Sequence, residues 1–278
     1  MPPTGFIPVK SIIRYLDYDA AKTTAEIDQC IRLARPSPKD MQELDAFMRA
    51  GEYQSWLTED SRHSALLVQG SFTAPRGRRS FSPLSYLCAS FARENANQER
   101  VVVLSYFCDL HELGARNQAG PAHLMCQLIG QLLAHPAVAR VYARDPIFHR
   151  HWEKKIRAQD LKTLVKAFSA LIRRLRRCEL VVFCLIDAIA KLETGTGTGT
   201  HRRQEFTVDV LSELRDLAQE RKRGRKRAAS DRVVFKLFVS AGAVRVAAAR
   251  FFDGQDTVDM AAGVGFRSRL GVPKRSSL

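Results

Sequence analysis

The sequence predicts an α/β fold in which helices cover both faces of a parallel sheet. Three observations lead to this prediction. Short apolar runs rich in β-branched residues alternate along the chain with longer segments of helical periodicity, which is the pattern of parallel strands joined by crossover helices. The 278 residues suffice for one such domain with a helical addition. The hydrophobic content of 45% is ordinary for a globular protein.

The first 60 residues are predicted to form a helical lead before the sheet. Ser37 is a candidate helix N-cap, because Pro38 follows at the first helical position and Asp40 lies in the first turn. Apolar residues then recur at helical spacing, at Met41, Leu44, Phe47 and Met48. The predicted division is a helical lead at 1–60, an α/β domain at 61–265 and a basic tail at 266–278.

Five short segments are predicted to be the strands of the sheet. They are residues 64–70, 100–107, 180–187, 232–240 and 256–262. Helices are predicted between them, because these stretches are amphipathic at helical spacing. They are residues 82–95, where Ser82 is the N-cap and Pro83 follows, 120–135, 160–177 and 207–222. The low-complexity stretch 195–200, "GTGTGT", is predicted to be a loop.

The six cysteines are scattered without a Cys-x-x-Cys pair. Most lie in apolar stretches, which is typical of reduced core thiols in an intracellular protein. The first residues contain no apolar stretch of signal-peptide length. The longest uninterrupted apolar run, 180–186, is too short to cross a bilayer. We therefore expect a cytoplasmic or nuclear protein with no membrane span.

The formal net charge of +15 is concentrated in blocks at the end of the helix 160–177, at 221–227 and at 266–275. Such blocks favour anionic partners. The stretch 221–227 is a nuclear-localisation signal, a nucleic-acid patch or a solvated loop. No aromatic-interleaved basic surface or DNA-reading motif accompanies it, so any nucleic-acid binding should be non-specific and sensitive to salt. The candidate patch consists of Arg221, Lys222, Arg223, Arg225, Lys226 and Arg227.

The segment after the first strand has the position of a phosphate-binding loop but not its residues. Such a loop needs backbone N–H groups at a helix N-terminus, a lysine and a Ser or Thr hydroxyl. Here the second glycine comes seven residues after the first, no lysine follows, and Pro83 removes a donor. We expect a structural connection between strand and helix. The candidate contacts for any nucleotide are Gly70, Gly77, Arg78, Arg79, Ser80 and Ser82.

Asp187 ends the most apolar strand, where an acid can hold magnesium through water. ATP hydrolysis also needs a group that positions or activates water. The residues that follow, Ala188 to Lys191, supply no carboxylate, and Glu193 is expected in the next loop. At the end of the fourth strand, Ser240 is either a phosphate-facing contact or a cap for the chain that follows. No catalytic residue is therefore predicted.

Zinc binding and nucleophilic hydrolysis are two other kinds of chemistry for which the chain has candidate residue types. Cys108 and His111, with His149 and His151, match no compact zinc motif by their spacing. A nucleophilic hydrolase would need an activated Ser or Cys, and no Gly-x-Ser-x-Gly elbow is present. Neither a zinc site nor a hydrolase of that type is expected.

In their order along the chain, five segments resemble the STAND class of phosphate-loop ATPases, most of all the NACHT-like domains of fungal NOD-like receptor relatives. They are "SWLTEDSRHSALLVQG", "SPLSYLCASF", "VVVLSYFCDLH", "LVVFCLIDAI" and "VVFKLFVS", and they span residues 40–262. The resemblance implies a P-loop-NTPase-like sheet in the order 5-1-4-3-2, with Gly70 and Asp187 at neighbouring strand ends. It also implies nucleotide-controlled assembly. The chain departs from the family where its D-G-x-D-E stretch is here Asp187-Ala188-Ile189-Ala190-Lys191.

These observations predict a degenerate NACHT-like module. It would act through protein partners or self-association, with weak or absent binding of ATP or ADP and magnesium. One alternative is a slow ATPase with an unconventional phosphate loop. A second alternative is non-specific nucleic-acid binding through the basic segments, which would require those segments to share one face.

Overall fold

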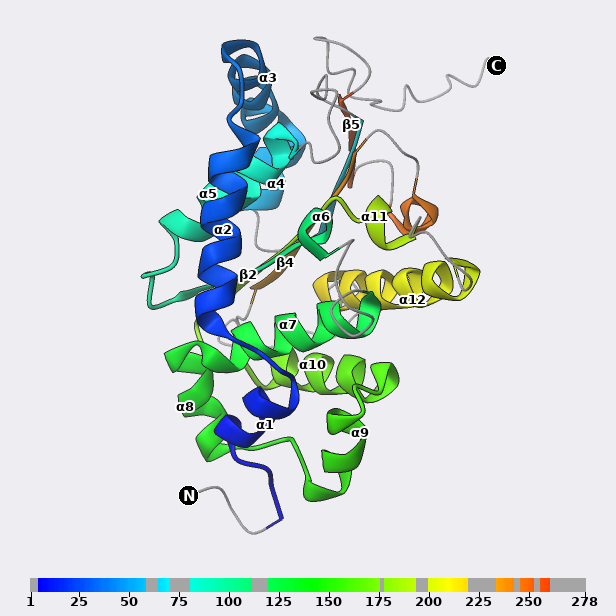
Figure 1. The fold of residues 1–278 in the computed structure, drawn as a ribbon. Coiled ribbons are helices and arrows are strands. Elements are labelled where there is room, and N and C mark those ends of the chain that lie inside the picture. Colours follow the sequence, from blue (N-terminus) through cyan, green and yellow to red (C-terminus); the bar gives the residue numbers. More distant parts are fainter. Residues whose placement is uncertain are drawn as a thin grey trace, which may run out of the picture.

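The computed structural model describes residues 5–58, 65–70, 81–111, 120–175, 178–193, 200–219, 234–242, 246–252 and 256–260. Within these residues, five strands form one sheet in the order β2-β3-β4-β1-β5, and all neighbouring strands are parallel (Figure 1). This is the predicted order counted from the other edge, so the predicted fold class is confirmed. The strands are β1 (Ala65–Gln69), β2 (Val101–Phe107), β3 (Val181–Asp187), β4 (Val234–Gly242) and β5 (Thr257–Asp259).

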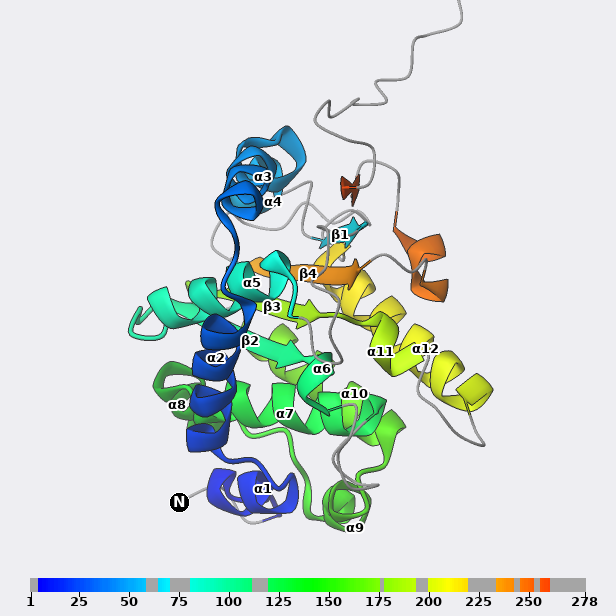
Figure 2. The same cartoon turned by 45° about the horizontal axis from the view of Figure 1, so that its top comes forward.

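Helices cover both faces of the sheet (Figure 2). Alternation along the strands creates the two cores, because successive side chains of a strand point to opposite faces. In β3, Phe183 and Leu185 join one core, while Cys184 and Ile186 join the other. The first core is covered by α2 (Ala20–Ala34), α3 (Pro38–Arg49), α4 (Gly51–Thr58) and α5 (Pro83–Glu94). The second is covered by α7 (Pro121–Ala134), α10 (Leu161–Leu175) and α12 (Thr200–Gln219).

Smaller helices extend the second layer and follow the strands. α1 (Val9–Tyr15) buries Ile12 in the same core as α7, and Leu16, directly after the helix, lies there as well. Gly130 of α7 accommodates Tyr18, since a Cβ atom at Gly130 would lie 2.2 Å from the Tyr18 ring. The N-terminal part of the lead is thus packed onto the sheet's helical layer. These elements are α1 (Val9–Tyr15), α6 (Cys108–His111), α8 (Pro136–Arg144), η1 (Arg150–Trp152), α9 (Glu153–Arg157), α11 (Ala190–Glu193) and η3 (Ala247–Phe251).

Two predicted helix starts are confirmed by their capping geometry. The Ser37 hydroxyl accepts from the Asp40 N–H, and the Asp40 carboxylate accepts from the Ser37 N–H at 2.8 Å. Ser82 and Ser85 form the same reciprocal pair at the start of α5. Both arrangements satisfy N–H groups that have no partner within the helix.

Other predicted boundaries were wrong. α12 begins at Thr200, not at 207, because its first turns are polar and carry no apolar periodicity to reveal them. β5 is shorter than the predicted strand 256–262 within the part of the chain that is described. The sequence did not predict α8, although Pro136 stands at its start and Val138 and Tyr142 are buried one turn apart. No helix among the described residues is both long and apolar enough to cross a membrane.

A buried lysine fastens α4 to the sheet. Lys236 of β4 is 2% exposed, and its Nζ donates to the carbonyl oxygens of Trp56 at 2.5 Å and Leu57 at 3.0 Å. In return, the Trp56 Nε1 donates to the Leu237 carbonyl at 3.0 Å. The lysine therefore satisfies carbonyls in the last turn of α4, where a positive charge also complements the helix dipole.

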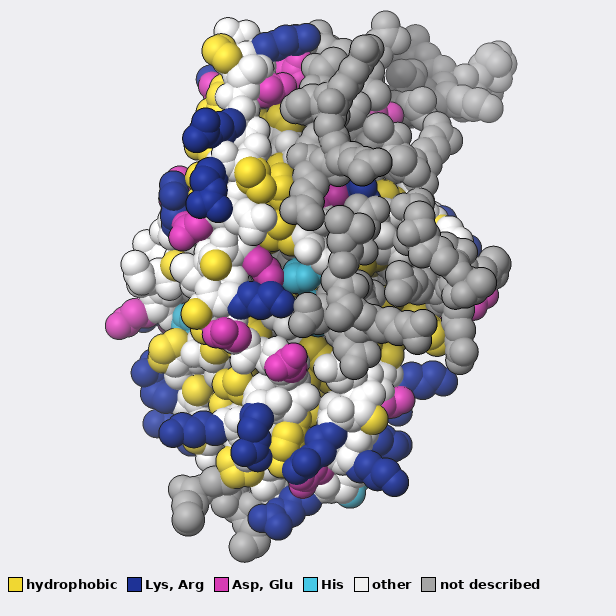
Figure 3. All heavy atoms as spheres, in the orientation of Figure 1, with side chains coloured by type: hydrophobic (Ala, Val, Ile, Leu, Met, Phe, Trp, Pro, Cys, Tyr) yellow, Lys and Arg dark blue, Asp and Glu magenta, His cyan; other side chains and the backbone are white. Residues whose placement is uncertain are grey.

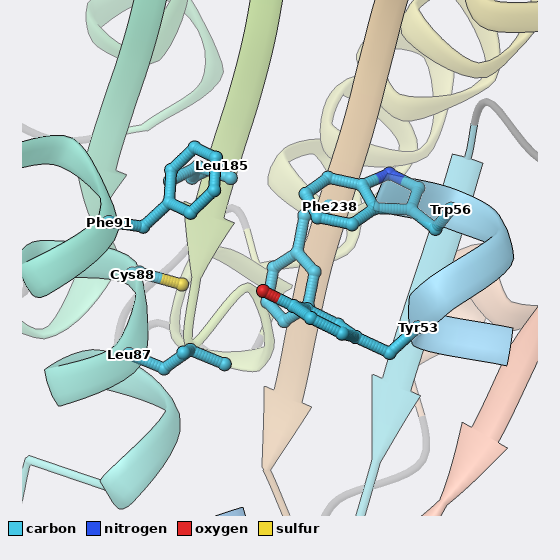
Figure 4. A pocket seen from close by; sticks show the side chains of 7 residues that line it. All are labelled: Tyr53, Trp56, Leu87, Cys88, Phe91, Leu185 and Phe238. Carbon is cyan, nitrogen blue, oxygen red and sulfur yellow. The ribbon is translucent and has the colours of Figure 1, made fainter. Parts of the chain in front are cut away.

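The space between α4 and α5 is filled by core side chains. Trp56 lies 5.5 Å from the ring centroids of both Phe183 and Phe238. The remaining gap has a volume of about 10 Å³, which is about the volume that one water molecule needs, and its lining is apolar. This region is packing and not a ligand pocket. Figure 4 shows the side chains around it, which are Tyr53, Trp56, Leu87, Cys88, Phe91, Leu185 and Phe238.

Candidate functional site

The ends of β1, β3 and β4 meet at one edge of the sheet, because the strands are parallel. Gly70 follows β1 with a φ of +103°, and its N–H donates to the Gly242 carbonyl at 2.8 Å. A left-handed backbone of this kind favours glycine. The prediction that Gly70 and Asp187 lie at neighbouring strand ends was wrong, because β4 lies between β1 and β3. The strand neighbour of Asp187 on this side is Ser240.

Ser240 fixes both the side chain and the backbone at the end of β3. Its hydroxyl donates to Asp187 Oδ1 at 2.5 Å and accepts from the Ala188 N–H at 2.9 Å. The Ser240 carbonyl accepts from the Ile189 N–H at 2.9 Å. The structure thus brings together two of the predicted site residues, and the Ser240 hydroxyl binds the turn after β3.

Asp187 is a buried acid with an incomplete set of partners. It is 1% exposed, and burial raises its pKa to about 6, while the hydroxyls of Ser240 and Ser85 act in the opposite direction and Asp109 raises it slightly further. Oδ2 has no hydrogen bond of normal geometry to any residue that the structure describes. Leaving a buried carboxylate oxygen unpaired is costly. Buried acids with a shifted pKa occur often at functional sites.

Sequence reasoning missed Ser85. This residue is fully buried in the first turn of α5, and its hydroxyl lies near enough to Asp187 to lower the pKa of that acid. Ser82 stands one turn earlier, and its hydroxyl is occupied by the Ser85 N–H at 3.1 Å. In phosphate loops, a hydroxyl in the first helical turn holds Mg²⁺ opposite a strand-end acid. The signal in the sequence that could have identified Ser85 is its place three residues after the N-cap Ser82, in the first turn of the helix.

Two described oxygen atoms that suit Mg²⁺ are Asp187 Oδ2 and the Ser85 hydroxyl, which also accepts from the Ser82 N–H at 3.0 Å. Carboxylate and hydroxyl oxygens are ligands that this hard cation accepts. The unpaired state of Oδ2 is the structural reason for placing an ion there. If the cation bound, it would offset the charge of Asp187 and order the phosphates of a nucleotide.

A family model described as Nephrocystin 3, N-terminal, matches residues 43–223, which is more than half of the chain. The chain belongs to the nephrocystin 3 N-terminal family. No curated protein matches it. The region that matches this family runs from within α3 to just beyond α12 and includes Ser85 and Asp187, whereas β4 with Ser240 lies outside it. Together with the sheet order, the family supports an NTPase-like domain in the broad sense.

The charged residues that follow β3, Lys191 and Glu193, are engaged in other contacts. Lys191 stands where the D-G-x-D-E pattern has its glutamate, and its Nζ lies 3.5 Å from Asp109 Oδ1. Glu193 was predicted to lie in a loop, and this was wrong, because it is the last residue of α11. It is 6% exposed, and its Oε2 accepts from the Ala247 N–H at 2.8 Å. Its carboxylate therefore fixes η3 to α11.

Several predicted site residues lie outside the described residues. In the loop after β1 these are Gly77, Arg78, Arg79 and Ser80. The basic patch at 221–227 and the tail at 266–278 lie outside as well. Their roles stay predictions.

Two separate groups contain His111 with His123 and His149 with His151. His111 stacks on Tyr106 with ring centroids 4.5 Å apart and lies near His123, whose pKa burial lowers to about 3. His149 and His151 stack on each other instead. In the described part of the chain, no three His, Cys, Asp or Glu side chains are arranged to hold a metal ion.

Proposed function

We propose that the chain is a degenerate NACHT-like module, related to those of fungal NOD-like receptor relatives, that acts through protein association. It binds nucleotide weakly or not at all and does not turn it over. The observation that carries this proposal is the contact of Glu193. The acid nearest to Asp187 along the chain is buried and accepts a backbone hydrogen bond, so it is not free to activate water.

The residues between the two acids support the same proposal. Ala188, Ile189 and Ala190 have no group that can orient water or accept a proton. Lys191 adds a positive charge where the D-G-x-D-E pattern of NACHT-like domains has its glutamate, and Asp109 pairs with it. A hydrolytic site built on Asp187 would therefore have a magnesium ligand without a base beside it.

The alternative of a slow ATPase is favoured by one observation, the unpaired Oδ2 of Asp187 opposite Ser85. In that case the phosphates would meet backbone from Gly70 to Ser82, with Arg78 or Arg79 in place of the usual lysine. Arginine is a poor substitute, because its planar fork does not reproduce the point charge of an ammonium group.

Turnover and association can be measured on the same protein. Phosphate release from Mg-ATP is expected not to exceed that of an Asp187→Asn variant, which has the same fold but no charge at this position. Sedimentation velocity over a concentration series is expected to show self-association that is the same with and without Mg-ATP. Turnover that disappears in Asp187→Asn, from a protein that stays monomeric at all concentrations, would establish the slow ATPase instead.

A further inference from the structure

One end of the molecule carries most of the net charge. We define the basic lobe as α1 together with residues 136–175, which contain α8, η1, α9 and α10. α1 contacts both α8 and α9, and α10 contacts both as well. The lobe has two cations on α1 and ten in 136–175, against three acids, which is an excess of nine in a chain of net charge +15. Figure 3 shows Lys and Arg side chains spread over α8, α1 and α9.

All twelve of these cations are exposed, whereas each of the three acids is already engaged within the lobe. Asp145 pairs with Arg174. Glu153 accepts hydrogen bonds from Tyr15 and Arg157. Asp160 accepts from the N–H and hydroxyl of Thr163 at the start of α10. The cations are Lys10, Arg14, Arg140, Arg144, Arg150, Lys154, Lys155, Arg157, Lys162, Lys166, Arg173 and Arg174.

Aromatic rings are exposed in the middle of this charge. His149 and His151, both exposed, stack with ring centroids 5.3 Å apart and an angle of 22°. The Phe6 ring lies 4.4 Å from that of His149 and is tilted by 36° to it, and Trp152 meets both histidines edge-on. A β-bridge between Phe6 and His149 fixes the arrangement through the backbone. The rings are therefore held in place before any ligand arrives.

We propose that the basic lobe binds single-stranded nucleic acid, with phosphates on its lysines and arginines and bases on the rings of Phe6, His149 and His151. Such binding combines a cationic surface with aromatic rings on which unpaired bases stack. Arg150 lies within the aromatic segment, and Lys154 and Lys155 follow it on α9. This proposal is independent of the function proposed for the strand-end site.

Other anionic partners fit the lobe less well. Firm binding to an acidic membrane surface combines cations with apolar side chains that enter the lipid. Among the described residues, the large apolar side chains that are clearly exposed are Leu33 and Met41, which lie on α2 and α3 and not in the lobe. An acidic protein surface would use the cations but gives no reason for an exposed ring stack. Bases in a duplex are not free to stack on it.

A groove of about 370 Å³ beside α8 extends the cationic surface toward the start of β3. Arg140 and Arg144, one helical turn apart, line one side of it. On the other side lie Glu99 and Glu179, of which Glu179 is paired with Arg100 at 3.1 Å. Two arginines in this groove are thus available for a phosphodiester backbone.

The test uses the full chain and fluorescence anisotropy with labelled oligothymidylate and oligouridylate of about 20 nucleotides. Binding is expected to weaken steeply with salt, as counterion release requires. The pair Lys154→Glu and Lys155→Glu should weaken binding about tenfold or more, because two phosphate contacts are lost. The matched pair Arg32→Glu and Arg93→Glu, which makes the same charge change at exposed positions outside the lobe, should leave affinity within about twofold.

The ring stack is tested separately. His149→Ala with His151→Ala should lower the affinity for single strands about fivefold or more. His149→Phe with His151→Phe keeps two rings and should restore it. A duplex of the same length should not respond to either pair. Equal effects on single strand and duplex would overturn the stacking part of the proposal.

Three results would overturn the whole proposal. One is the absence of oligonucleotide binding at low salt. Another is loss of binding in Arg225→Glu with Lys226→Glu, with no loss in the lobe pair, which would assign binding to the stretch 221–227. The third is a protein that binds phosphatidylserine vesicles but not oligonucleotides, with the vesicle binding weakened by Lys154→Glu with Lys155→Glu. Circular dichroism and melting curves of each variant verify that the fold is kept.

Discussion

At the scale of single residues, Ala188 shows how the turn after Asp187 has diverged. Its φ of +54° lies in the left-handed region, where a Cβ atom costs about 1–2 kcal/mol. The resemblance to NACHT-like domains places a glycine here, which would adopt this backbone without strain. The turn therefore holds an alanine in a conformation that suits glycine. The hydrogen bond from the Ala188 N–H to the Ser240 hydroxyl stabilises it there.

Ala188→Gly is therefore expected to stabilise the protein by about 1 kcal/mol, the relief of strain being partly offset by the freer unfolded chain. Urea unfolding at equilibrium measures the change. The same substitution at Ala170, inside α10, should instead cost about 1 kcal/mol. A loss of stability in Ala188→Gly would mean that the turn is not strained.

Asp187 gives the stability curve a distinct dependence on pH. Burial raises its pKa from 3.8 to about 6 in the folded state, so the folded protein holds this proton more tightly than the unfolded chain does. The resulting stabilisation is complete below about pH 4, is lost as the pH rises to about 6, and then stays lost. The two-unit shift corresponds to an effect on the order of 3 kcal/mol.

Asp187→Asn should remove this dependence. The difference in unfolding free energy between variant and wild type is expected to change by about 3 kcal/mol between pH 4 and 7, in favour of the variant. Asp160→Asn is the control, since hydrogen bonds from Thr163 lower the pKa of Asp160. The stabilisation that Asp160 gives the folded protein is present at neutral pH and is lost on acidification, so this variant should show the opposite dependence on pH. A difference for Asp187→Asn that stays constant with pH would show that Asp187 titrates normally.

At the scale of helices and strands, the sequence predicted the elements that satisfy strong local rules. β1 to β4 are short, largely apolar runs, and α3 and α5 start at serines followed by proline, so each has a local signal. The polar start of α12 and the short α11 have none, which is why Glu193 was placed in a loop.

The site was less predictable than the fold, because its contacts join distant segments. Asp187 was found as a strand-end acid, but its contact with Ser240 depends on which strand is its neighbour. Ser85 was not predicted as a site residue, because the sequence indicates that Ser82 caps the helix but not that the Ser85 side chain points toward Asp187. The ring stack was missed because Phe6 reaches His149 only through the fold.

The lysine in β4 allows a test of how α4 is held. Lys236→Met is expected to lower the free energy of unfolding by about 2–3 kcal/mol, because two carbonyls at the end of α4 lose their donor in a buried position. Lys162→Met on the exposed face of α10 should change it by no more than about 0.5 kcal/mol. Chemical denaturation compares the two. Equal effects would mean that α4 is held by its apolar contacts alone.

At the scale of the whole molecule, the basic lobe should make stability depend on salt. Nine excess cations on one end of the chain repel one another, and the screening length falls from about 30 Å at 10 mM salt to about 8 Å at 150 mM. The melting temperature is expected to rise over this range. The variant with Lys154→Glu and Lys155→Glu should show a smaller rise, whereas an equal rise would place the repulsion elsewhere.

The central claim is that the NTPase-like fold persists here without a working nucleotide site. Calorimetric titration of Mg-ATP and Mg-ADP into the protein, with Asp187→Asn and Ser85→Ala as controls, tests it most directly. We expect a Kd no tighter than about 1 mM, which corresponds to only about 4 kcal/mol of binding free energy, and the same weak heat in both variants. Saturable binding with a Kd of about 1 µM that weakens in both variants would contradict the claim.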